Sequence, residues 1–153
     1  MLGCLLSAGV MLGDASHAQT WDSPLPLANG SSTFNSCAVP SQMLLMDNGI
    51  FPIYAPAVVY RVNQWQRGFN PPPLRVWSVT LSPQTGTDMS LWVCQQKTGN
   101  FVSQCVDASD NYGNGVPEHV IVPTVIGTYY VIVTGNIENQ SPMCSSYWLT
   151  AIH

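Results

Sequence analysis

Short segments rich in β-branched and aromatic residues recur along most of this chain, about ten residues apart. Glycine, proline and asparagine turns separate them, and no window of useful length shows the apolar period of a helix. The segments expected as strands are 57–65, 74–81, 89–94, 101–106, 118–122, 128–134 and 146–152, with 41–46 either a short strand or a helical turn. This pattern predicts an all-β fold, namely an antiparallel β-sandwich of jelly-roll-like type.

The length of 153 residues suits a single domain. Residues 1–18 are expected to be a signal peptide, because a short apolar run precedes small residues that suit cleavage before Gln19. No Lys or Arg precedes that run, so a retained segment packed on the body or on a neighbouring subunit is the alternative. The run is too short to span a bilayer. We expect residues 19–56 to form an irregular arm and residues 57–153 to form the sandwich domain, stapled by disulfides.

Cleavage of the leader would leave an even number of cysteines, as an oxidising compartment favours. Cys94 and Cys105 lie on either side of an expected hairpin turn at 97–100, which suits a disulfide across the hairpin. Cys37 and Cys144 would then tie the arm to the segment before the last strand. Four cysteines allow three pairings, and the sequence leaves the choice open. A four-thiolate metal site is the alternative, but it lacks any CxxC pair.

Charged residues make up only 8% of the chain, against about a quarter in an average soluble domain. The four Lys and Arg residues are scattered, so no basic patch predicts a nucleic-acid partner. A surface this poor in charge is more usual for an extracellular or surface-assembled protein than for a cytosolic enzyme. Together with the leader, it predicts a secreted protein.

Few residues of the chain suit acid–base or nucleophilic catalysis. His17 would leave with the leader and His153 is the last residue, so His119 is the candidate imidazole, and its neighbour Glu118 must point to the opposite face of their strand. No Gly-x-Ser-x-Gly or His-Glu-x-x-His motif is present. Asp88 and Asp110 are conceivable as a glycosidase pair, but carboxylates that cap turns are the favoured interpretation. We therefore expect no enzymatic activity.

An acidic loop at 107–111 offers Asp107, Asp110 and Asn111 as oxygen ligands for calcium. The loop does not match a twelve-residue EF-hand, and an ordinary turn rich in Asp and Asn is the alternative. No other cofactor is expected.

Six motifs follow one another in the second part of the chain: 59–62 (VYRV), 77–81 (WSVTL), 87–93 (TDMSLWV), 108–111 (ASDN) followed by Gly113, Gly115 and Glu118, 127–133 (GTYYVIV) and 147–151 (YWLTA). In this order they resemble the bacterial pre-peptidase C-terminal domain, a secreted β-sandwich. The resemblance covers some ninety residues and leaves out 19–56. It implies a module without catalytic residues, which in some members of the family binds matrix polymers or calcium.

Three aromatic residues are expected to point away from the sandwich core, because alternate residues of a sandwich strand face outward. They are Trp92, Tyr130 and Trp148. Such a platform predicts a binding surface for a polysaccharide or matrix polymer. Two alternatives stay open: the aromatics serve contacts between copies of the protein in an extracellular filament or surface assembly, or the 19–56 arm covers them.

Overall fold

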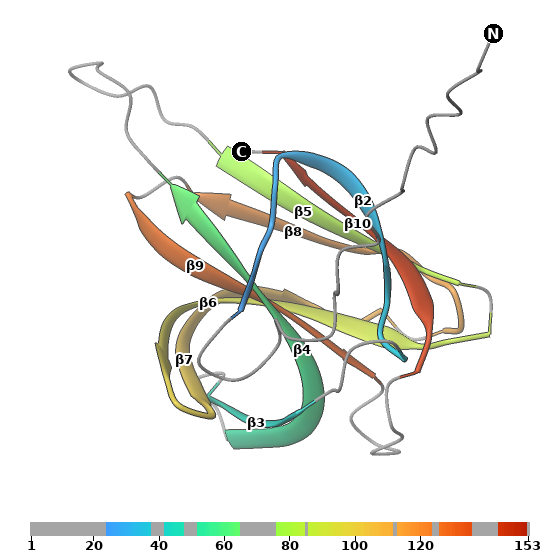
Figure 1. Ribbon diagram of the computed structural model, residues 1–153, viewed down its shortest axis with the longest axis horizontal. Helices are drawn as coiled ribbons and strands as arrows, with labels where there is room; N and C mark the ends of the chain where they lie inside the picture. Colours follow the sequence, from blue (N-terminus) through green and yellow to red (C-terminus); the bar gives the residue numbers. More distant parts are fainter. Residues whose placement is uncertain are drawn as a thin grey trace, which may run out of the picture.

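The computed structural model describes residues 24–37, 42–47, 52–64, 76–84, 86–111, 113–123, 126–135 and 144–152. Ten strands run through these residues (Figure 1): β1 (Leu25–Pro26), β2 (Gly30–Asn35), β3 (Gln42–Asp47), β4 (Pro52–Gln64), β5 (Val76–Pro83), β6 (Met89–Thr98), β7 (Phe101–Ser109), β8 (Glu118–Pro123), β9 (Gly127–Gly135) and β10 (Ser146–Ile152). The described residues contain no helix. The all-β prediction is confirmed, and 42–47 is a strand rather than a helical turn.

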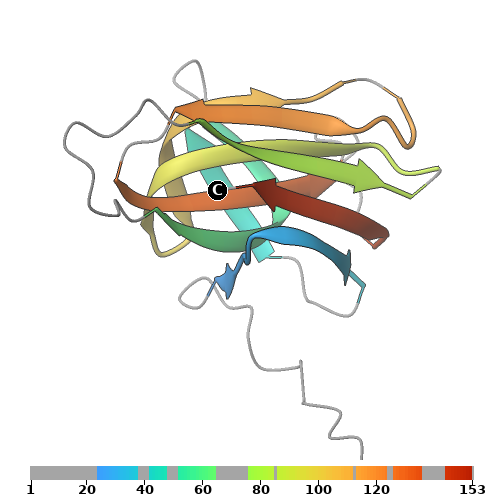
Figure 2. The same cartoon turned by 90° about the horizontal axis from the view of Figure 1, so that it is seen from above.

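Two sheets stack face to face (Figure 2). The smaller sheet has the order β2-β10-β5-β8 and is antiparallel throughout. The larger has the order β1-β4-β3-β7-β6-β9. Between them lies a core in which aromatic rings fill much of the space; Trp77 meets Tyr129 edge to face, with ring centroids 5.1 Å apart. The predicted β-sandwich is therefore confirmed.

The larger sheet also closes on itself into a small barrel. β4 is long enough to pair with two partners, because residues 52–57 pair with β3 and residues 57–64 pair with β9. With β3–β7, β7–β6 and β6–β9 also paired, the five strands form a closed ring. Its interior holds a second apolar cluster, which consists of Leu44, Met46, Ile53, Ala55, Ala57, Val59, Trp92, Cys94, Val102 and Ile132. The molecule thus has two cores.

The middle parts of β4, β6 and β9 form the wall between these cores, and there both faces of each strand are buried. On β6, Leu91 and Val93 point into the sandwich core while Trp92 points into the barrel. On β9, Val131 points into the sandwich core and Ile132 points into the barrel. A strand buried on both faces reads as a continuous apolar run rather than an alternating one, as these segments do.

The prediction of an irregular arm over 19–56 is wrong for the residues that the structure describes. β1, β2, β3 and the first part of β4 all lie there, and the expected boundary at 56/57 falls inside β4. β2 carries almost no apolar pattern of its own, and six backbone positions of β10 hold it in register. The pairs β1–β4 and β3–β7 are parallel, so the larger sheet is mixed rather than purely antiparallel. The expected signal peptide at 1–18 lies outside the described residues.

The two disulfides are Cys94–Cys105 and Cys37–Cys144, which is the pairing expected if one disulfide crosses the hairpin. Cys94 and Cys105 are opposite each other on β6 and β7, where the register shifts by a bulge and Gln104 adopts a positive φ of 54°. Cys37 and Cys144 join the residues just after β2 and just before β10. Of the three possible pairings, the structure therefore contains this one.

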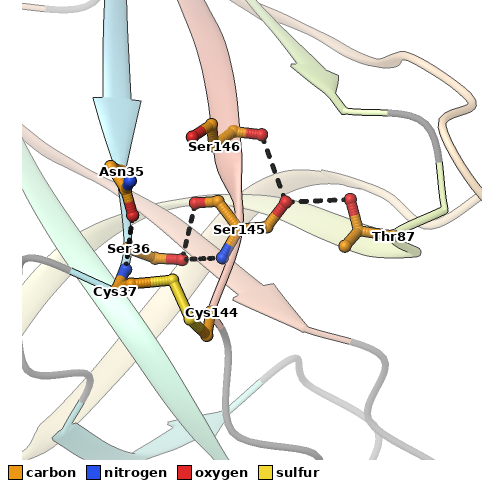
Figure 3. Close-up of a disulfide and its surroundings, with 7 residues drawn as sticks. All are labelled: Asn35, Ser36, Cys37, Thr87, Cys144, Ser145 and Ser146. Atoms are coloured by element: carbon orange, nitrogen blue, oxygen red, sulfur yellow. Dashed lines mark hydrogen bonds between the residues drawn. A yellow bond between two sulfur atoms is a disulfide. The ribbon is translucent and has the colours of Figure 1, made fainter.

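A short hydrogen-bond network supports the second disulfide (Figure 3). The Ser36 N–H donates to the Ser145 carbonyl over 2.9 Å. The Ser36 hydroxyl also donates to that carbonyl over 2.9 Å and accepts from the Ser145 N–H over 2.7 Å. The Cys37 N–H donates to the Asn35 side-chain oxygen over 2.8 Å. These bonds continue the β2–β10 ladder by one residue pair and fix where β2 ends.

Candidate binding surface

Trp148 lies in the middle of the outer face of the smaller sheet. Its position on β10 is in register with Thr33 on β2 and Ser82 on β5. The preceding and following residues, Tyr147 and Leu149, point into the sandwich core. The indole is 48% exposed, which is high for the largest apolar side chain and leaves much of its surface open to solvent.

Hydroxyl groups form the next row of this face. Thr150 on β10 lies between Ser31 on β2 and Thr80 on β5, and Thr80 lies opposite His119 on β8. The Thr150 hydroxyl donates to the Ser31 hydroxyl over 3.0 Å, and the Thr80 hydroxyl is 2.8 Å from His119 Nδ1. These bonds hold the side chains in fixed positions across the sheet.

The four strands present no Asp, Glu, Lys or Arg side chain on the outer face. Glu118 is the one Asp, Glu, Lys or Arg residue in the four strands of this sheet, and it points inward and is fully buried. The exposed residues that follow the hydroxyl row are Ile121 and Ile152, which both lie opposite Ser78. The face is therefore poor in charged side chains and partly apolar, with one large aromatic ring.

Trp92 does not belong to an exposed surface, and its expected exposure is wrong. The side chain is only 8% exposed and lies inside the barrel, where its Nε1 has no hydrogen-bond partner among the described residues. The alternation itself was right, since Leu91 and Val93 face the sandwich core. Strand β3 and the first half of β4, which belong to the expected arm, cover the other face.

Tyr130 is also separated from Trp148. It is half-buried on β9 and packs against the barrel core, whereas Trp148 lies on the far side of the smaller sheet. The three aromatics therefore form no common platform, and Trp148 alone remains a candidate for stacking on a ligand. The alternative that the arm covers the outward aromatics is confirmed for Trp92.

The acidic loop makes hydrogen bonds within the protein. The Asp107 carboxylate accepts from the N–H groups of Ala108 and Ile121, and Asp110 accepts from the Ser90 hydroxyl over 2.7 Å. The described residues contain no group of three or more His, Cys, Asp or Glu side chains arranged for a metal ion. Binding of calcium through Asp107, Asp110 and Asn111 stays a prediction.

Glu118 is the anchor of this loop, a role that the sequence analysis missed. Its Oε2 accepts hydrogen bonds from the Ser109 hydroxyl over 2.5 Å and from the Asn111 N–H and Nδ2, each over 3.0 Å. The sequence did contain a signal for this burial. Glu118 is two and four residues before Val120 and Val122, so it lies on the same inward-facing side of β8. His119 is exposed, so the two neighbours do point to opposite faces, as predicted.

The two-layer β-sandwich has a counterpart of similar fold among solved structures. The solved structure of the pre-peptidase C-terminal domain of a collagenase from Bacillus anthracis is similar, with a TM-score of 0.50 and 11% sequence identity. The likeness covers 84% of this chain and 94% of that one. It confirms the resemblance at the level of the fold.

No protein-family model matches the chain. No curated protein matches it either. Within the described residues, the structure has no helix long and apolar enough to cross a bilayer.

Proposed function

We propose that this protein is a secreted, non-catalytic module that binds an extracellular polysaccharide or matrix polymer through the outer face of the smaller sheet. One observation carries the proposal: Trp148 is half-exposed on a face that presents hydroxyl groups and no Asp, Glu, Lys or Arg side chain. An exposed indole offers apolar area for stacking, and neighbouring hydroxyls offer hydrogen bonds to a neutral ligand.

Secretion is supported by the two disulfides, which persist in oxidising compartments. The similar domain belongs to a collagenase, which supports a partner among extracellular polymers. A role without catalysis is supported by the described polar residues. His119 is held by Thr80 on one face, while Glu118 is buried and bonded to the acidic loop on the other, so they form no acid–base pair.

The test is sedimentation of the purified protein with insoluble cellulose, chitin and collagen. We expect one of these polymers to retain the protein and Trp148→Ala to weaken that binding by about tenfold, as the loss of one stacked aromatic predicts. Tyr54→Ala is the matched control, because Tyr54 is an aromatic of similar exposure (53%) on β4, outside the proposed face.

Retention that survives Trp148→Ala would place binding elsewhere on the molecule. A protein that none of these polymers retains would contradict the proposal itself.

A further inference from the structure

The outer edge of β2 is an open sheet edge. β2 stands at the margin of the smaller sheet (Figure 2), and the Ser36–Ser145 backbone bond marks a hydrogen-bonded pair of the β2–β10 ladder. Since such pairs alternate, Ser32 and Phe34 direct their backbone groups toward β10. Ser31, Thr33 and Asn35 therefore direct their N–H and C=O groups away from the sheet, and no hydrogen bond to these groups is present among the described residues.

The opposite margin of the same sheet is closed. On β8, the N–H of His119 donates to the Ser109 hydroxyl and the N–H of Ile121 donates to the Asp107 carboxylate, each over 3.3 Å. Both acceptors are side chains of β7, in the other sheet. Side chains that occupy an edge in this way prevent another strand from pairing there. The two margins of one sheet thus differ in whether a strand can be added.

We infer that β2 pairs with β2 of a second copy of this chain, antiparallel and around a two-fold axis at Thr33. In that register, Thr33 lies opposite Thr33 of the other copy, and Ser31 lies opposite Asn35 of the other copy. Each of the three resulting pairs exchanges two backbone hydrogen bonds, so every outward group of the three residues finds a partner. A symmetric contact of this kind is the commonest arrangement in protein oligomers.

The composition of β2 fits a copy of itself. The strand reads GSSTFN, without charge that would repel its own copy and without proline that would interrupt a ladder. Its residues are exposed except for the half-buried Phe34, which packs on Tyr60 and Tyr147 inside the sandwich. The side chains that meet in the dimer are therefore small or polar, and backbone bonds supply the contact.

The pairing would join the two outer faces into one eight-stranded sheet. Trp148, Thr33 and their counterparts then share a single row, and the two indoles are separated by three strand spacings, about 14 Å. A polymer that contacts both rings would be held more tightly than by either ring alone. The dimer does not depend on the proposed function, because it is defined by backbone contacts.

Sedimentation velocity over a concentration series tests the pairing directly. We expect the wild-type protein to shift from monomer to dimer as the protein concentration is raised to about 1 mM. This range includes the dissociation constants of weak dimers. Thr33→Pro removes an outward N–H that makes no bond within the chain, so this variant is expected to stay monomeric with an unchanged unfolding midpoint. A wild-type protein that stays monomeric throughout overturns the proposal.

Cysteine variants test the register. In Thr33→Cys, the two Cα atoms face each other at about 5.5 Å, within disulfide range, so a covalent dimer is expected on oxidation. Ser31→Cys is the matched control on the same strand, because its Cα lies about 15 Å from its counterpart. Equal cross-linking of both variants, or of neither, contradicts β2–β2 pairing in this register. Loss of polymer binding by Trp148→Ala alone bears on the proposed function and leaves the dimer untouched.

Discussion

At the scale of single residues, buried polar side chains decide how the connections between strands are held. Glu118 is completely buried, yet its carboxylate accepts three hydrogen bonds that fasten the loop after β7 to the start of β8. Hydrogen bonds to a charged acceptor are stronger than neutral ones, and a donor left without one in the interior is costly.

We expect Glu118→Ala to lower the free energy of unfolding by about 2–4 kcal/mol, because it removes these bonds and leaves a cavity. The neighbouring His119→Ala should change it by less than about 1 kcal/mol, since His119 is exposed. Urea unfolding of both variants measures the difference. Equal effects would show that Glu118 is not the anchor.

Tyr147 makes stability depend on pH at the alkaline end. Burial raises the pKa of its phenol to about 12, against the ordinary 10, and the hydrogen bond with the Tyr60 hydroxyl (2.5 Å) offsets only part of this shift. Because the unfolded side chain ionises first, stability is unaffected below about pH 10 and falls as the pH rises from about 10 to about 12.

The expected loss of unfolding free energy over this interval is up to about 2–3 kcal/mol. Urea unfolding at a series of alkaline pH values measures it. Tyr147→Phe has no phenol to ionise, so its stability should vary less with pH over the same interval. A variant that loses stability as steeply as the wild type would assign the effect to other groups.

The direction of single side chains could be predicted from alternation, but their exposure could not. Leu91, Val93 and Leu149 face the sandwich core as expected, and Trp148 is exposed as expected. Trp92 obeys the same alternation and is nevertheless buried. Whether the second face of a strand meets water depends on which distant segment covers it, and alternation within the strand contains no information on that.

At the scale of elements, β2 and the first part of β4 have the weakest strand pattern among the residues of the expected arm. β2 contains one aromatic residue among small and polar ones, and β4 carries prolines at 52 and 56. Such residues ordinarily argue against strands. They are tolerated here because β2 is an edge strand and because β4 bends from β9 to β3 near Pro56. The strongly apolar strands were predictable, and these partners were not.

The barrel core predicts a contrast between two tryptophans. Trp92→Ala should lower the free energy of unfolding by about 3–5 kcal/mol, because it empties the centre of the barrel. Trp148→Ala should cost less than about 1 kcal/mol, since the indole is half-exposed. Thermal or urea unfolding distinguishes them. A small effect of Trp92→Ala would mean that the barrel contributes little to stability.

The two disulfides are expected to differ in their effect. On the chain-entropy model, the Cys37–Cys144 loop of 107 residues is worth about 4.8 kcal/mol and the Cys94–Cys105 loop of 11 residues about 2.8 kcal/mol. The double variants Cys37→Ala/Cys144→Ala and Cys94→Ala/Cys105→Ala, compared by urea unfolding, test this order. The reverse order would show that packing around the buried Cys94 outweighs loop entropy.

At the scale of the whole molecule, the low charge has a measurable consequence for binding. If the outer face of the smaller sheet is the binding surface, no ion pairs form and no counterions are released. We expect retention on the polymer to change by less than about twofold when salt is raised to 1 M, where the Debye length falls to about 3 Å. A steep decline with salt would assign binding to the charged residues outside this face.

The closed margin of β8 limits how far copies of this chain can associate through their sheets. Ser109 and Asp107 already accept hydrogen bonds from the backbone N–H groups of His119 and Ile121 at that margin, so among the described residues the open margin of this sheet is β2. When two copies pair through β2, neither has a second open margin in this sheet with which a third copy could pair. The assembly therefore stops at a finite size. Growth into fibres by strand addition therefore has no route through this sheet, and a filament would have to form through other surfaces.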